Sequence, residues 1–121
     1  MSKICVVDDS KFQLNSIKTI MVELGYEVEA FNDSLLALEA LKTNEYDCLC
    51  TDLLMPNIDG IELVKELKKI NSKMPTIVLT ANVQDTVEKK CKEIGVNYFL
   101  NKPVNKEMMK SVLKNIIKEN D

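Results

Sequence analysis

Residues 4–10 have the sequence ICVVDDS, a short apolar run that ends in two aspartates. Four consecutive apolar residues, three of them β-branched, are typical of a strand buried on both faces. From Ser10 onward the apolar residues recur three or four positions apart, which predicts a helix, and Gly25 is a typical helix stop. The apolar positions of this helix are Leu14, Ile17, Met21 and Leu24. The stretch therefore predicts a strand, a polar junction and a helix.

The same alternation continues to the end of the chain. Further strands are predicted over residues 26–31, 46–51, 76–80 and 98–100. The intervening helices are predicted from apolar spacing at Leu35, Leu38 and Leu41; at Leu63, Leu67 and Ile70; at Val83, Val87, Cys91 and Ile94; and at Met109, Val112, Leu113, Ile116 and Ile117. This order predicts a doubly wound α/β fold, with a five-stranded parallel sheet and five helices on both faces. Strands one, three and four are the most apolar and should be central.

The composition narrows the possible functions. The 121 residues suit a single domain spanning 1–121, and the net charge is -3. The chain has no histidine and no arginine, which argues against histidine-based catalysis and against nucleic acid as the main partner. No apolar run approaches the roughly 20 residues of a membrane span. The four cysteines form no CxxC pair, so we expect structural thiols in a cytoplasmic protein.

Polar residues follow four of the five predicted strands. Asp8 and Asp9 end the first strand, Asp52 the third and Thr80 the fourth, and Lys102 comes just after the fifth. Any one of these residues alone has an ordinary explanation as a helix cap or a solvated charge. Because the carboxyl ends of parallel strands meet at one edge of the sheet, all five are expected to converge there.

Such a cluster suits a particular chemistry. Three carboxylates repel one another unless a cation joins them, and their hard oxygen ligands suit Mg²⁺. The positive charges of Lys102 and Mg²⁺ would stabilise the negatively charged oxygens of a phosphoryl group, and Thr80 could donate a hydrogen bond to one of them. One aspartate could then act as the nucleophile and form an acyl phosphate.

The chain resembles the response-regulator receiver domains of two-component signalling, which have the CheY-like, flavodoxin-like fold. The resemblance extends from about residue 3 to about residue 118 and rests on four segments: VVDDS at 6–10, DLLMPNIDG at 52–60, Thr80-Ala81 and Lys102-Pro103. It implies that Asp52 accepts a phosphoryl group from a histidine kinase. It also implies a cis peptide bond between Lys102 and Pro103.

The resemblance also implies roles for the surrounding residues. Mg²⁺ would be bound by the carboxylates of Asp8, Asp9 and Asp52 and by the backbone carbonyl of Leu54. Lys102 and Thr80 would bind the phosphoryl group, and Thr80 and Phe99 would form the switch. Because successive residues of a strand alternate between its two faces, Tyr98 should point to the face of the sheet opposite Phe99.

Several functions remain open at this stage. The first is a stand-alone phospho-receiver, itself no enzyme, that signals to an output protein such as a flagellar motor or adaptor protein in chemotaxis. The alternative is a phosphorelay intermediate that passes its phosphoryl group to a histidine phosphotransfer protein. A phosphatase of the haloacid-dehalogenase type would need an acid two residues after Asp52, where this chain has Leu54. A flavodoxin-like cofactor carrier would need a phosphate-binding loop where this chain has the acidic pair.

Two positions should control how long the phosphoryl group lasts. Leu54 lies two residues after Asp52, and Asn82 lies two residues after Thr80. In the resembled family these positions border the path of the attacking water. Leu54 offers no hydrogen bond to that water, and the neutral amide of Asn82 is no general base. We therefore expect slow self-dephosphorylation, with an external phosphatase where rapid reset is needed.

Overall fold

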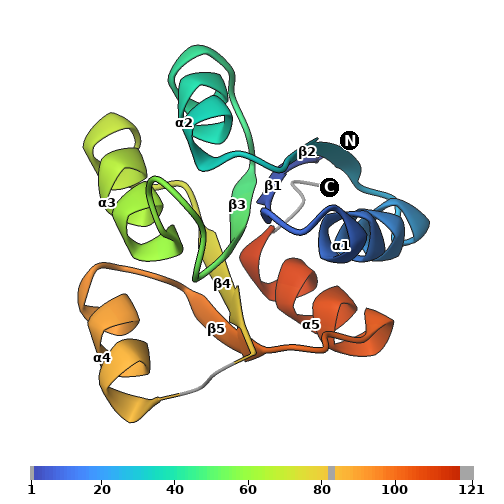
Figure 1. The fold of residues 1–121 in the computed structure, drawn as a ribbon. Coiled ribbons are helices and arrows are strands. Elements are labelled where there is room, and N and C mark those ends of the chain that lie inside the picture. The colour runs from blue at the N-terminus through green and yellow to red at the C-terminus, as the bar shows by residue number, and fades with distance from the viewer. Residues whose placement is uncertain (1, 82–83, 118–121) are drawn as a thin grey trace.

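The fold alternates strands and helices along the whole chain (Figure 1). The computed structural model describes residues 2–81 and 84–117. The strands are β1 (Lys3–Val7), β2 (Glu27–Phe31), β3 (Cys48–Asp52), β4 (Thr76–Thr80) and β5 (Tyr98–Asn101). The helices are α1 (Lys11–Glu23), α2 (Ser34–Thr43), α3 (Gly60–Ile70), α4 (Asp85–Glu93) and α5 (Lys106–Ile116).

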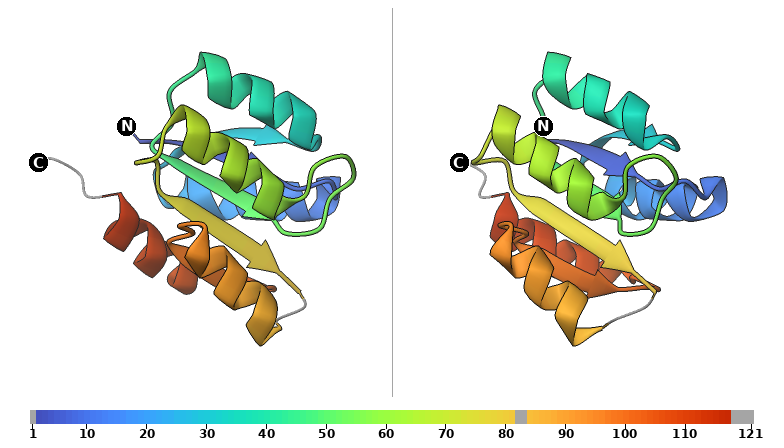
Figure 2. Two further views of the ribbon diagram at one scale, coloured as in Figure 1. Left: turned by 90° about the vertical axis from the view of Figure 1, so that its left-hand side faces the viewer. Right: turned by 60° about the vertical axis from the view of Figure 1, so that its left-hand side comes forward.

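The five strands form one parallel sheet in the order β2-β1-β3-β4-β5. The three central strands are therefore β1, β3 and β4, as the sequence predicts. Helices cover both faces of the sheet, with α1 and α5 on one side and α2, α3 and α4 on the other (Figures 1 and 2). The predicted doubly wound α/β fold is confirmed.

Alternate residues of each central strand face opposite layers. On β1, Ile4 and Val6 pack with α1 and α5, whereas Cys5 and Val7 pack with the helices of the other face. The same alternation on β5 sends Tyr98 to the α1–α5 side and Phe99 to the α2–α4 side, which confirms the expected orientation of the two aromatic rings. Burial on both faces explains the continuous apolar runs.

The third strand differs from its predicted boundaries, since it begins at Cys48 and extends to Asp52. Tyr46 is buried, but its hydroxyl donates a hydrogen bond to the carboxylate of Glu29 and its ring lies 5.4 Å from the ammonium of Lys3. Asp47 accepts the backbone N–H of Lys3 on its carboxylate at 2.7 Å. Tyr46 is therefore linked to the amino end of the sheet through its side chain. Asp47 is linked both through its carboxylate and through its backbone N–H, which donates to Lys3 O at 2.8 Å.

The four cysteines are buried free thiols. Burial raises the pKa of Cys50 to about 12, so this thiol stays protonated and packs as a small apolar group. In the described part of the chain, no helix is long and apolar enough to cross a lipid bilayer. The first residue predicted for the fourth helix, Val83, lies outside the described residues.

Candidate functional site

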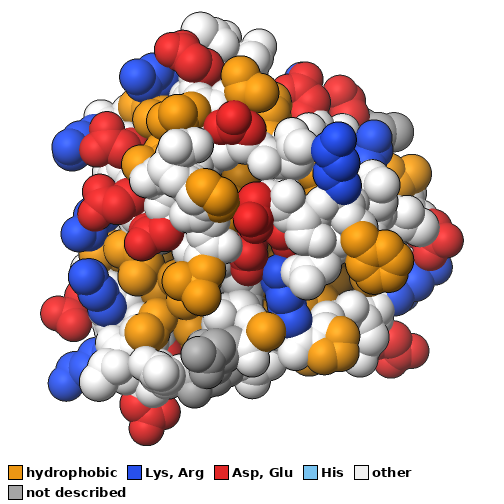
Figure 3. All heavy atoms as spheres, in the orientation of Figure 1, with side chains coloured by type: hydrophobic (Ala, Val, Ile, Leu, Met, Phe, Trp, Pro, Cys, Tyr) orange, Lys and Arg blue, Asp and Glu red, His pale blue; other side chains and the backbone are white. Residues whose placement is uncertain are grey.

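The residues predicted to bind the metal and the phosphoryl group lie at the carboxyl edge of the sheet. Asp8 follows β1, Asp52 ends β3, Thr80 ends β4 and Lys102 follows β5. Figure 3 views the molecule from this edge and shows acidic side chains gathered at its centre with a basic side chain beside them. The parallel topology therefore joins residues that are far apart in the sequence.

Lys102 ties the site together. Its ammonium nitrogen lies 2.8 Å from Asp8 Oδ2 and 3.0 Å from Asp52 Oδ1, and it also donates to Oε1 of Gln13. The Lys102 side chain is 12% exposed, so both ion pairs are partly shielded from water. Its backbone N–H donates to Thr80 O at 2.9 Å, and the peptide bond to Pro103 is cis, as expected.

The acidic pair divides into a buried and an exposed member. Asp8 is 2% exposed, and its Oδ1 accepts the backbone N–H of Ser10 at 2.9 Å. Ser10 caps α1 by accepting the N–H of Gln13, so the start of the helix fixes the loop that carries the acidic pair. Asp9 is exposed to solvent.

The three carboxylates fit a hard divalent cation. One oxygen from each of Asp8, Asp9 and Asp52 lies within 4.8 Å of the others. Mg²⁺ prefers such oxygen ligands and fills its remaining positions with water. Asp9 is open to solvent, from which those waters would come. The donor set therefore suits Mg²⁺.

The electrostatics of the site oppose the ionised form of Asp52. Burial and the nearby negative charge of Asp8 raise its pKa, although its hydrogen bond with Lys102 acts in the other direction. Burial alone would lower the pKa of Lys102, but the hydrogen bonds to Asp8 and Asp52 outweigh it and the net shift is upward. Lys102 therefore stays positively charged, and further positive charge near Asp52 would stabilise the ionised form of its carboxylate.

The two predicted switch residues lie on neighbouring strands. Thr80 is 2% exposed at the end of β4, and Phe99 is half-buried on β5 against the α2–α4 layer. The register pairs Val78 with Phe99 and Thr80 with Asn101. One backbone hydrogen-bond ladder therefore connects the two positions.

The loop after β3 is held by hydrogen bonds from Ser34 and Gly60, residues to which the sequence analysis assigns no role in the site. Ser34 Oγ at the start of α2 donates to Pro56 O at 3.1 Å and accepts Ile58 N–H at 3.4 Å. Gly60 N–H donates to Leu53 O at 2.8 Å. Between these points the Leu54 side chain is 66% exposed. Asn82, predicted to act with Leu54, lies outside the described residues.

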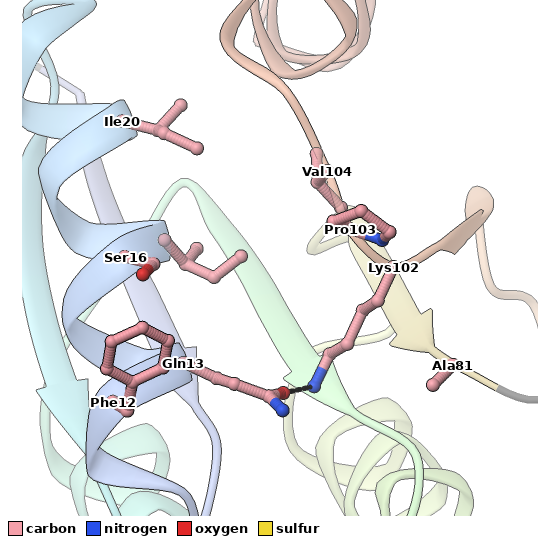
Figure 4. Close-up of a pocket in the computed structure, with 9 residues that line it drawn as sticks. Phe12, Gln13, Ser16, Ile20, Ala81, Lys102, Pro103 and Val104 are labelled. Carbon is pink, nitrogen blue, oxygen red and sulfur yellow. Dashed lines mark hydrogen bonds between the residues drawn. The ribbon is translucent and has the colours of Figure 1, made fainter.

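A groove of about 370 Å³ opens beside the acidic cluster (Figure 4). One wall is α1 and the other is the segment after β5. Its lining is mainly apolar, but it contains Gln13 and Lys102, which point toward each other across it. Sequence reasoning missed Gln13, because nothing in a helical pattern shows which exposed side chain meets a lysine from a distant loop.

Comparison with known proteins agrees with this geometry. The family model described as the response regulator receiver domain matches residues 4–114. The chain is 36% identical over 106 residues to the sensor protein EvgS of Escherichia coli K12, covering 88% of this chain and 9% of that protein. The chain thus spans about a tenth of the length of this curated relative.

Two solved structures have the same fold. The chemotaxis protein CheY4 of Vibrio cholerae is similar with a TM-score of 0.90 and 28% identity, covering 97% of this chain and 99% of that one. The receiver domain of sensor histidine kinase PA1611 from Pseudomonas aeruginosa has a TM-score of 0.89 and 26% identity, covering 98% of each chain. The latter has a magnesium ion coordinated in its active-site cleft.

Proposed function

Because the chain belongs to the response regulator receiver domain family of two-component signalling, we propose that Asp52 accepts a phosphoryl group from a histidine kinase in a Mg²⁺-dependent reaction. The observation that carries the proposal is the ion pair of Lys102 with both Asp52 and Asp8, beside the exposed Asp9. This arrangement supports the proposal, because the carboxylate proposed as the nucleophile lies beside an ammonium and beside two further carboxylates that could bind a metal ion.

The residues would divide the work of the transfer. A carboxylate oxygen of Asp52 attacks the phosphorus, the bond from phosphorus to the histidine nitrogen breaks, and the imidazole leaves with that electron pair. Lys102 holds a phosphoryl oxygen and offsets its charge. Asp8, Asp9, Asp52 and the carbonyl of Leu54 would hold Mg²⁺, which supplies further positive charge when bound. No step requires a histidine in this chain.

We propose that phosphorylation is read through Thr80 and Phe99. A phosphoryl group can shift a conformational equilibrium only if the two states contact it differently. A hydrogen bond from Thr80 to the phosphoryl group would supply that difference. Phe99 on the adjoining strand would transmit it to the surface formed by α4, β5 and α5.

The output we favour is regulation of a partner protein in chemotaxis. The similarity to CheY4, whose name states a chemotaxis role, supports this assignment. The relay alternative requires a second histidine protein that removes the phosphoryl group from Asp52. We propose that residues 1–121 act as one receiver unit in either case, and that the unit acts in the cytoplasm without binding nucleic acid or membrane.

A labelling experiment tests the proposed transfer. The protein is incubated with a labelled phosphoramidate, with and without Mg²⁺, and the modified residue is mapped. We expect label on Asp52 only with Mg²⁺, and none in Asp52→Asn. Asp47→Asn is the matched control, since Asp47 lies before the other end of the same strand. Label that persists in Asp52→Asn would overturn the assignment.

Partner assays separate the two outputs. The labelled protein is mixed with candidate histidine phosphotransfer proteins and, separately, with candidate motor and adaptor proteins. Phosphorylation-dependent binding without loss of label supports the signalling role. Rapid movement of label from Asp52 to a histidine of the second protein supports the relay.

A further inference from the structure

Lys102 has a third acceptor that neither the acidic cluster nor the proposed function accounts for. A lysine ammonium carries three protons, and here they are directed to Asp8, Asp52 and the side-chain carbonyl of Gln13 (Figure 4). The first two acceptors are charged, and they lie just after β1 and at the end of β3. Gln13 is neutral and comes from α1. The ammonium is therefore held from three directions.

The orientation of the Gln13 amide follows from chemistry. An ammonium only donates hydrogen bonds, so the oxygen of the amide must face Lys102 and Nε2 must face away. Within residues 2–81 and 84–117, Nε2 has no hydrogen-bond acceptor. The contact to Lys102 is thus the one that fixes this side chain.

Gln13 is mounted on a rigid element. Its backbone N–H donates to Oγ of Ser10, the residue that caps α1, at 3.3 Å. Leu14 and Ile17 are buried on the same helix and fix its rotation against the sheet. The backbone from which the Gln13 side chain extends is consequently held by the core of the protein and does not belong to a flexible loop.

We propose that Gln13 is a positioning residue for Lys102 in the phosphoryl transfer, an inference that rests on the proposed function. The three N–H bonds of an ammonium point to the corners of a tetrahedron, so fixing two of them fixes the third. When Asp52 carries a phosphoryl group, Asp8 and Gln13 can keep their two protons. The third proton then points to the phosphoryl oxygens, so the flexible lysine side chain need not sample other conformations to reach them.

The neutral charge of Gln13 matters as much as its reach. A glutamate would also accept the hydrogen bond, but it would add a fourth carboxylate beside the incoming phosphoryl group and repel it. A leucine would leave the third proton of Lys102 to water. Once Asp52 carries the phosphoryl group, Asp8 alone would then orient the ammonium. Replacement by glutamate and by leucine therefore separates charge from position.

The first measurement follows the ammonium directly in the Mg²⁺-free, unphosphorylated protein. Proton exchange of the Lys102 ammonium with water is measured by nitrogen-15 NMR. We expect slow exchange in the wild type and in Gln13→Glu, and clearly faster exchange in Gln13→Leu. Asn15→Leu is the matched control, because Asn15 is an exposed amide on the same helix. Equal exchange in the wild type and Gln13→Leu would show that the amide does not hold the lysine.

The second measurement uses beryllofluoride with Mg²⁺ as a phosphoryl mimic. We expect Gln13→Leu to bind it about five-fold more weakly, the effect of one net hydrogen bond. Gln13→Glu should also bind more weakly despite its slow ammonium exchange. Asn15→Leu should match the wild type, and the thermal midpoints of both Gln13 variants should stay near the wild-type value because the side chain is exposed.

The possible failures are distinguishable. If Gln13→Leu binds beryllofluoride as tightly as the wild type or more tightly, Gln13 is a bystander or a competitor and the positioning role is wrong. If the wild type itself binds no beryllofluoride at Asp52, the proposed phosphoryl transfer fails and the positioning role falls with it.

Discussion

Gly60 approaches the backbone carbonyl oxygen of Asp52 so closely that no side-chain carbon fits between them. A Cβ atom at Gly60 would collide with that oxygen and would lie 3.1 Å from Leu53 Cα. These neighbours are backbone atoms, which cannot turn aside as a flexible side chain can. Glycine at the first residue of α3 therefore permits the close approach of this helix to Asp52.

We expect Gly60→Ala to lower the free energy of unfolding by about 1–3 kcal/mol, the usual cost of overpacking, and to slow labelling of Asp52. Gly25→Ala is the control. Gly25 has a φ of +97° but no atom within 4 Å of its Cβ position, so alanine should cost about 1–2 kcal/mol through backbone strain alone. Urea unfolding and labelling rates check both variants. Normal labelling in a destabilised Gly60→Ala would show that the contact supports only the fold.

Asp9 offers the cleaner test of metal binding. It is exposed, whereas the buried Asp8 also pairs with Lys102. Asp9→Ala should weaken Mg²⁺ binding about ten-fold, equivalent to roughly 1.4 kcal/mol, and leave the stability of the metal-free protein equal or higher because like-charge repulsion is relieved. Calorimetry and thermal unfolding measure the two effects. Unchanged Mg²⁺ affinity in both Asp9→Ala and Asp8→Ala would remove the acidic pair from the metal site.

The switch has a signature that can be seen residue by residue. With beryllofluoride and Mg²⁺, backbone NMR shifts should concentrate in residues 80–105, because Thr80 and Phe99 would carry the change outward from Asp52. Asp52→Asn under the same conditions should show no such shifts. Shifts confined to residues 8–12 and 52–60 would contradict this route.

The lifetime of the phosphoryl group should depend on Leu54. We expect Leu54→Asn to shorten the lifetime several-fold, because an amide can orient the attacking water and a leucine cannot. The decay of labelled protein measures this, with Asn82→Ala compared beside it. Leu36→Asn is the control, since Leu36 is a comparably exposed leucine, on α2. Equal decay rates in all variants would show that these side chains do not control the water.

Tyr46 and Glu29 should give the fold an acid-sensitive contact. The hydrogen bond from Tyr46 and the contact with Lys3 lower the pKa of Glu29, so this contact stabilises the fold above the ordinary pKa of 4.5 and weakens as the pH falls through the lowered pKa. Tyr46→Phe should cost about 0.5–1.5 kcal/mol at pH 7, and less in acid. Urea unfolding from pH 3 to pH 7 measures the difference. In a Glu29→Gln background the difference should no longer depend on pH.

The sequence predicts the arrangement of the fold because both faces of the central strands are buried, so the apolar runs mark strands and their ends mark the site edge. Asp8, Asp52 and Lys102 come together because the carboxyl ends of their parallel strands lie at the same edge of the sheet. The predicted start of the third strand at Tyr46 is wrong, because an aromatic ring can be buried outside a strand when its hydroxyl donates a hydrogen bond to a carboxylate. Gln13 and Ser34 could not be predicted, since their partners are set by helix rotation and by loops far away in the sequence.

The hydroxyl of Ser34 has a mechanical consequence. Its hydrogen bonds with Pro56 and Ile58 join the first residue of α2 to the loop after β3. The hydrogen bond from Gly60 N–H to Leu53 O joins the two ends of that loop. The loop beside Asp52 is therefore held by hydrogen bonds at several of its residues. We therefore expect a group bound at Asp52 to leave the loop around Leu54 in place. The motion that this group causes should occur on the opposite side of the site, where the backbone N–H of Lys102 bonds Thr80 O.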